Sequence, residues 1–124
     1  MEENYICYET AKLAGEKRFK VYQKTQYSRG VNPTTIYHYT KEQCKLFNDV
    51  YYRPTQSLLQ KWLREKYEID ITIHRSFSMC NSYHYCIIIN NNYEMEIDQP
   101  CKSNRSYEEA LEDALIVSLN IINK

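Results

Sequence analysis

The sequence predicts an α+β fold in which helices pack on one face of an antiparallel meander sheet. Three observations lead to this prediction. Apolar residues recur at helical spacing over 54–67, apolar and polar residues alternate over 70–98, and helical spacing returns after Ser106. The expected order of elements is α-β-β-α-α-β-β-β-α. With 124 residues, the chain is expected to form a single domain that buries its own core.

The N-terminal portion, residues 1–53, is expected to form two short helices and two strands. Gly15 comes near the end of the first helix, where it suits a left-handed terminal residue. No linker rich in proline, glycine or serine follows this portion, so we expect it to be continuous with residues 54–124 in one domain. The expected elements are a helix over 9–15, a strand over 19–27, a turn over 28–33, a strand over 34–39 and a helix that the capping box Thr40-Lys-Glu-Gln43 begins.

The C-terminal portion begins with the strongest helix signal in the chain. Pro54 keeps the preceding residues out of the helix, and Thr55 is placed to cap its first turn. The three strands that follow alternate apolar and polar residues, which is typical of a sheet covered on one face. Met95 is expected on the apolar face together with Ile87 and Ile89, and Glu96 on the polar face.

The last helix begins with a second capping box, Ser106-Tyr-Glu-Glu109. Its C-terminal half is apolar almost all round, which a helix on the surface of a monomer would not need. We therefore expect a homo-oligomer that forms through this helix. The residues that make it apolar all round are Ile116, Val117, Leu119 and Ile121.

Composition excludes several classes of protein. Sixteen basic and sixteen acidic residues cancel, so the chain lacks the net positive charge of a non-specific nucleic-acid binder. The five cysteines are odd in number and never spaced as Cys-x-x-Cys, which argues against a disulfide framework and a zinc knuckle. The N-terminus resembles no signal peptide and no apolar run could span a membrane, so we expect a cytoplasmic protein.

The surplus of tyrosine is the one feature that indicates recognition. Tyrosine offers rigid amphipathic contact area, and arginine forms forked hydrogen bonds with phosphate. An AT-rich gene would overuse tyrosine in any case, so a purely compositional origin stays open. The residues predicted to line a pocket for a planar or phosphorylated ligand include Tyr37, Tyr39, Arg53, Arg75, Tyr83 and Tyr85.

Catalytic and metal sites are weakly indicated. Pairing Phe77 near Tyr83 would place His74 opposite Cys86, with His84 one step diagonal. Imidazole and thiolate suit zinc, but no fourth ligand stands at a standard spacing. Neither glycine is in a phosphate-binding loop. We therefore expect no catalytic residue, no metal and no cofactor.

The order helix, three strands, helix from Thr55 onward matches a double-stranded-RNA-binding domain in topology. Such domains carry lysines at the start of the last helix, whereas here Tyr107-Glu-Glu109 would repel phosphate. A nucleic-acid-associated module is therefore the alternative function, and nucleic-acid binding is not expected.

The segment Pro54-Thr-Gln-Ser-Leu-Leu-Gln-Lys-Trp-Leu-Arg-Glu-Lys-Tyr67, together with Glu9-Thr-Ala-Lys-Leu-Ala14 and Tyr107-Glu-Glu-Ala-Leu-Glu112, resembles small uncharacterised proteins encoded by phages and prophages of gut bacteria. The resemblance implies a phage accessory role in the host cytoplasm and transfers no site residues. Such proteins often neutralise a host factor. Counter-defence is therefore what the resemblance implies. Together with the small size, the apolar last helix and the surplus of tyrosine and arginine, it leads us to expect a non-enzymatic protein that binds a host protein or a small ligand, a nucleotide among the candidates.

Overall fold

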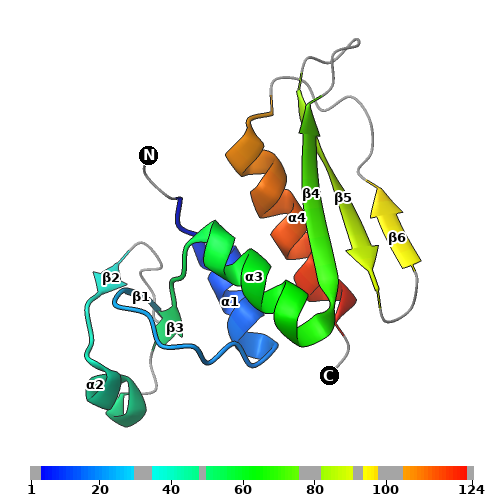
Figure 1. Ribbon diagram of the computed structural model, residues 1–124. Helices are drawn as coiled ribbons and strands as arrows, with labels where there is room; N and C mark the ends of the chain where they lie inside the picture. Colours follow the sequence, from blue (N-terminus) through cyan, green and yellow to red (C-terminus); the bar gives the residue numbers. More distant parts are fainter. Residues whose placement is uncertain are drawn as a thin grey trace. The chain divides into compact units, whose positions relative to one another are not determined.

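The computed structural model describes residues 4–29, 35–47, 50–75, 82–90, 94–97 and 105–122. It contains helices and antiparallel sheets, so the predicted α+β class is confirmed. The described residues form two compact units, one ending at Thr55 and the other beginning at Gln56 (Figure 1). This division falls two residues beyond the expected join between the two portions. The prediction that both portions form one continuous domain stays a prediction.

The described part of the first unit contains one three-stranded sheet and two helices. Its three strands are antiparallel in the order β2-β1-β3. The strand β3 was not predicted, so the observed order contains one strand more than expected between the second and third helices. The elements are α1 (Tyr8–Glu16), β1 (Gln26–Ser28), β2 (Ile36–Tyr37), α2 (Lys41–Leu46) and β3 (Val50–Tyr52).

The strand expected over 19–27 is wrong for most of its length, because only Gln26 and Tyr27 are in β1. After α1 the chain turns through Arg18, whose φ is 68°, and the Phe19 N–H donates to Ala14 O at 2.9 Å. Phe19 is buried as an anchor of this turn, not as a strand residue. An apolar residue can be buried in a turn as well as in a strand, and the alternation of apolar and polar residues does not distinguish these two cases.

The left-handed position expected at Gly15 is wrong, because Gly15 lies inside α1 and Arg18 takes that conformation. Gly15 is required for a different reason. A Cβ atom at this position would lie 2.9 Å from Cδ1 of Tyr51, which is closer than such contacts occur in proteins. The missing side chain therefore lets α1 approach β3.

The second unit is the predicted antiparallel meander, with strand order β4-β5-β6. Both of its helices pack against the sheet, and Figure 1 shows them on the same side. Side chains of Ile69, Ile71, Ile87 and Ile89 are buried under these helices, which is the alternation that the sequence predicted. The elements are α3 (Gln56–Tyr67), β4 (Ile69–Arg75), β5 (Tyr83–Ile89), β6 (Glu94–Ile97) and α4 (Tyr107–Ile121).

The face predicted for Met95 in β6 is wrong. Met95 lies opposite Ile88 in the register, and its side chain is 57% exposed. Glu96, expected on the polar face, takes the position opposite the buried Ile87. The strand β6 is therefore offset by one residue from the arrangement that the sequence predicted. An offset of one residue exchanges the two faces of a strand.

Both predicted capping boxes are present. The Gln43 N–H donates to Thr40 Oγ1 at 3.2 Å, and the Thr40 N–H donates to Gln43 Oε1 at 2.9 Å. In the second unit, the Glu109 N–H donates to Ser106 Oγ at 3.1 Å, and the Ser106 N–H donates to the Glu109 carboxylate at 3.0 Å. Among the described helices, none has the length and apolar character that crossing a membrane requires.

Candidate functional site

The six residues predicted to bind a ligand are divided between the two units. Tyr37, Tyr39 and Arg53 belong to the first unit, whereas Arg75, Tyr83 and Tyr85 belong to the second. The idea that all six line one pocket stays a prediction, and each group is described within its own unit.

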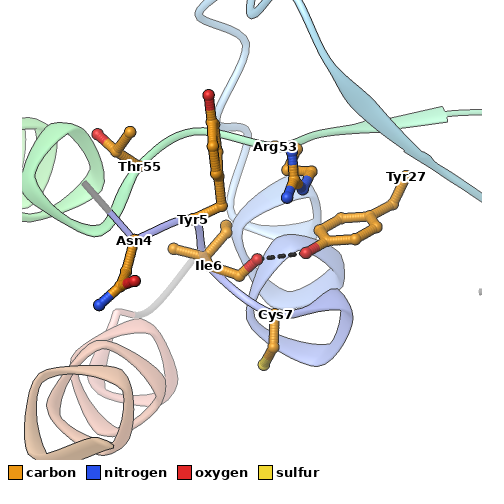
Figure 2. Close-up of a pocket in the computed structure, with 7 residues that line it drawn as sticks. All are labelled: Asn4, Tyr5, Ile6, Cys7, Tyr27, Arg53 and Thr55. Atoms are coloured by element: carbon orange, nitrogen blue, oxygen red, sulfur yellow. Dashed lines mark hydrogen bonds between the residues drawn. The ribbon is translucent and has the colours of Figure 1, made fainter. Parts of the chain in front are cut away.

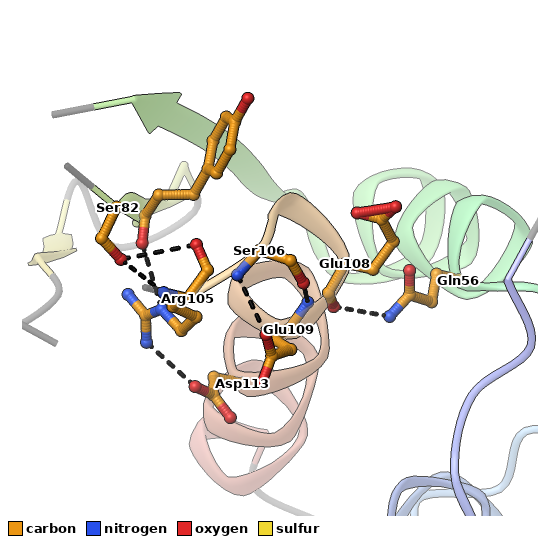
Figure 3. A network of polar contacts seen from close by, with 8 residues as sticks. Gln56, Ser82, Arg105, Ser106, Glu108, Glu109 and Asp113 are labelled. Atoms are coloured by element: carbon orange, nitrogen blue, oxygen red, sulfur yellow. Dashed lines mark hydrogen bonds and ion pairs between the residues drawn. The ribbon is translucent and has the colours of Figure 1, made fainter. Parts of the chain in front are cut away.

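In the second unit, the predicted residues contribute to a structural network. The Arg75 guanidinium lies 5.8 Å from the ring centre of Tyr83, and the Arg105 guanidinium lies 5.6 Å from that of Tyr85. Arg105, whose side chain is 5% exposed, pairs with Asp113 at 2.9 Å and donates from Nε to Tyr83 O at 3.0 Å (Figure 3). The charge of Arg105 is therefore used to join α4 to the start of β5.

The other end of this network joins the two helices of the second unit. Gln56 Nε2 donates to Glu108 O at 2.9 Å, as Figure 3 shows. It also donates to the Glu112 carboxylate at 2.8 Å. Sequence reasoning assigned no role to Gln56 or Arg105. The partners of Gln56 lie 52 and 56 residues away in the chain. The partners of the Arg105 side chain lie 8 and 22 residues away, so no local pattern could have revealed either role.

The predicted pairing of His74 with Cys86 is wrong. His74 lies opposite His84, and Cys86 lies opposite Thr72. The hairpin pairs Arg75 with Tyr83, a shift of two positions that preserves the faces but separates His74 from the thiol. Within the residues that the structure describes, no three histidine, cysteine or acidic side chains are arranged to hold a metal ion.

Tyr37 and Tyr39 pack on one another in the first unit. Their rings are stacked, with centres 4.9 Å apart and planes at 15°, and Phe47 lies 5.5 Å from Tyr39. The buried Gln26 holds this segment, because its amide accepts from the Tyr39 N–H at 2.9 Å and its Nε2 donates to Gln23 O at 2.6 Å. Neither tyrosine lines the cleft that contains Arg53.

Arg53 directly follows β3 and lies between two aromatic rings. Its guanidinium is 3.9 Å from the ring centre of Tyr5 and 5.5 Å from that of Tyr27 (Figure 2). Its Nη1 donates to Thr25 Oγ1 at 3.3 Å, and its backbone N–H donates to Thr25 O at 3.2 Å. The arginine is therefore positioned by Thr25, just before β1, on one side and by Tyr5 of the N-terminal segment on the other.

The N-terminal segment is held by backbone pairing. Tyr5 and Thr55 form an antiparallel bridge, and the Ile6 N–H donates to Pro54 O at 3.1 Å. The Tyr27 hydroxyl donates to Ile6 O, as Figure 2 shows. These bonds fix Tyr5 over Arg53.

The resulting space, here named the Arg53 cleft, has a volume of about 850 Å³. Arg53 Nε is buried and has no hydrogen-bond partner among the described residues. Among the described residues, no carboxylate pairs with this guanidinium and no acidic residue lines the cleft. The cleft therefore presents a positive charge on aromatic walls. Its lining residues are Asn4, Tyr5, Ile6, Cys7, Tyr27, Arg53 and Thr55.

Of these lining residues, sequence reasoning identified only Arg53. Tyr27 was interpreted as a strand residue, and Tyr5 stands in a stretch without periodicity. Only their contacts with Arg53 distinguish them from the other tyrosines.

No family model matches the chain, and no curated protein or solved structure matches it significantly.

Proposed function

We propose that this chain is a binding protein, not an enzyme, and that it holds a small anionic ligand in the Arg53 cleft. The observation that supports this function is the Arg53 guanidinium, which stands in a cleft without a described acidic partner and with a buried, unsatisfied Nε–H. A buried charged donor without an acceptor is costly, and an anionic ligand would offset that cost.

The aromatic rings support the same proposal. A guanidinium between tyrosine rings keeps its charge while losing contact with water, which strengthens its attraction for an oxyanion. Tyr5 and Tyr27 occupy these positions at 3.9 and 5.5 Å from Arg53. Phosphate and carboxylate are the oxyanions that a planar guanidinium fork recognises best.

We place this binding activity in a phage or prophage accessory protein that acts in the host cytoplasm. The motivation is the resemblance of the segment 54–67 to such proteins and the small size of the chain. A protein that sequesters a small signalling ligand would serve counter-defence without catalysis.

Native mass spectrometry of the gently purified protein tests the ligand directly. We expect the wild-type protein to carry an additional mass of a few hundred daltons, and the Arg53→Gln variant to lose it. Arg53→Lys should retain less than the wild type, because lysine keeps the charge but lacks the fork. Lys12→Gln removes an exposed cation of α1 that does not line the cleft, and it should retain the full mass. A wild-type protein without additional mass would contradict the proposal.

The same spectrum tests the homo-oligomer that we expect to form through α4. Within the chain, Leu119 is fully buried, whereas Ile116, Val117 and Ile121 remain partly exposed. These three side chains are the surface that a partner copy would cover. The expected species is a dimer that Val117→Glu converts to a monomer, and a monomeric wild type would exclude this interface.

A host protein is a second candidate ligand, and one surface of the first unit favours it. Leu46 at the end of α2 is 77% exposed, and the neighbouring Phe47 is exposed as well. Exposed large apolar side chains that lie together mark interaction sites more often than scattered ones do. Loss of a captured host protein in Leu46→Ser, with the Arg53 ligand retained, would assign this surface.

The nucleic-acid module stays the alternative. The order α3-β4-β5-β6-α4 in the second unit favours it, and the first turn of α4 opposes it. Hydrogen bonds from the Ser106 backbone and side chain lower the pKa of Glu109, so this carboxylate is charged at neutral pH. Salt-dependent retardation of duplex RNA would support the alternative, and none is expected.

A further inference from the structure

Two clefts of the first unit share one wall. The Arg53 cleft is one of them, and a second cleft of about 350 Å³ is also lined by Tyr5, Arg53 and Thr55. Tyr5 is 47% exposed and stacks on Arg53 at 3.9 Å, and this pair of side chains lines both spaces. Arg53 can therefore face a ligand in either of them.

The second cleft adds a cation and a tyrosine to the first. Lys24 lines it, as do Tyr22 and Thr25, and none of its described lining residues is acidic. Tyr22 is held in place, because its hydroxyl donates to Tyr39 O at 2.7 Å. In the part of the chain that the structure describes, the two clefts together present Arg53 and Lys24 on walls with three tyrosines and no carboxylate. We name this second cleft the Lys24 cleft; its lining residues are Tyr5, Tyr22, Gln23, Lys24, Thr25, Arg53 and Thr55.

We infer that the Arg53 cleft and the Lys24 cleft are two halves of one site, whose ligand carries an aromatic ring and two anionic groups. A nucleoside diphosphate is the simplest ligand of this class. The inference rests on the proposed function and adds the second charge and the ring. The ring would stack on Tyr5, one anionic group would accept from Arg53, and the other would reach Lys24.

The dimensions agree with this class of ligand. Each volume, about 850 Å³ in the Arg53 cleft and about 350 Å³ in the Lys24 cleft, exceeds what an inorganic anion needs. Pockets for organic ligands of this size span roughly 300 to 1,000 Å³. Arg53 lines both clefts, whereas Lys24 lines only the smaller one, so a ligand with two anionic groups can offer one to each cation.

Calorimetric titration with four probes separates the contributions of ring and charge. The probes are adenosine, pyrophosphate, AMP and ADP, in low-salt buffer with EDTA so that no divalent cation neutralises the phosphates. We expect ADP to bind about tenfold more tightly than AMP, since a second charge-assisted contact forms. Adenosine and pyrophosphate should each bind more weakly than ADP.

Variants assign the two charges. Lys24→Gln should lower the affinity for ADP to that for AMP and leave AMP unchanged, whereas Arg53→Gln should weaken both. Lys12→Gln should change neither. Equal affinity for ADP and AMP in the wild type would overturn the inference, and Arg53-dependent binding of AMP would then still support the proposed function. If pyrophosphate bound as tightly as ADP, the aromatic ring would contribute nothing to binding, and that part of the inference would be overturned. If none of the probes bound in a manner that depends on Arg53, the whole inference would be overturned.

Discussion

Two buried serines of the second unit differ in whether their hydroxyl groups have partners. Ser118 on α4 is fully buried, and its Oγ has no hydrogen-bond partner among the described residues. Ser82 is equally buried, but its Oγ accepts from the Arg105 N–H at 3.0 Å. We expect Ser118→Ala to raise the free energy of unfolding by about 1 kcal/mol, because a buried hydroxyl without a partner is costly.

Ser82→Ala is the matched control in the same unit. It should lower the free energy of unfolding by about 1 kcal/mol, because it leaves the Arg105 N–H without its acceptor. Urea unfolding followed by far-ultraviolet circular dichroism measures both changes. Equal effects of the two substitutions would mean that Ser118 has a partner in solution.

At the scale of elements, the two capping boxes differ in one titratable group. The box at α4 contains Glu109, and the box at α2 contains Gln43 in the same position. Hydrogen bonds from Ser106 lower the pKa of Glu109 from its ordinary value of 4.5. Its contribution to stability is therefore present above pH 4.5 and is lost as the pH falls through the lower pKa of the folded state.

Glu109→Gln converts the second box into the chemistry of the first. We expect the variant to keep the cap and to lose the part of acid destabilisation that Glu109 causes. Comparing unfolding midpoints of both proteins between neutral pH and pH ~3 checks this, since the pKa values of free carboxyl groups lie near 4. An identical decline in both proteins would show that other carboxylates dominate.

At the scale of the whole molecule, unfolding tests whether the two units form one domain. The buried Gln26 of the first unit makes hydrogen bonds to the backbone of Tyr39 and Gln23, so Gln26→Leu should destabilise that unit by about 2 kcal/mol. Trp62, the single tryptophan, lies in the second unit. If the chain is one cooperative domain, the Trp62 fluorescence midpoint in urea should fall in Gln26→Leu.

An unchanged Trp62 midpoint would instead mean that the units unfold independently. Circular dichroism of the same samples is the control, because it must show that Gln26→Leu has weakened the first unit.

The sequence by itself determined the α+β class, the helix of 56–67, the meander and both capping boxes. Each of these depends on residues that lie close together in the chain. A helical stripe, an alternating strand or a cap formed over three residues is visible in any short window. The sequence indicated Arg53 only through the chemistry of its guanidinium, and it did not indicate which side chains surround it.

Tertiary structure decided the strand β3, the register of β6 and the surroundings of Arg53. The strand Val50–Tyr52 is stabilised by pairing with Gln26–Ser28, which no local pattern indicates. Register depends on how two strands meet, and a one-residue offset placed Met95 on the open face. Tyr5, Thr25 and Tyr27 reach Arg53 across 26 to 48 residues, so the cleft exists only once the chain has folded.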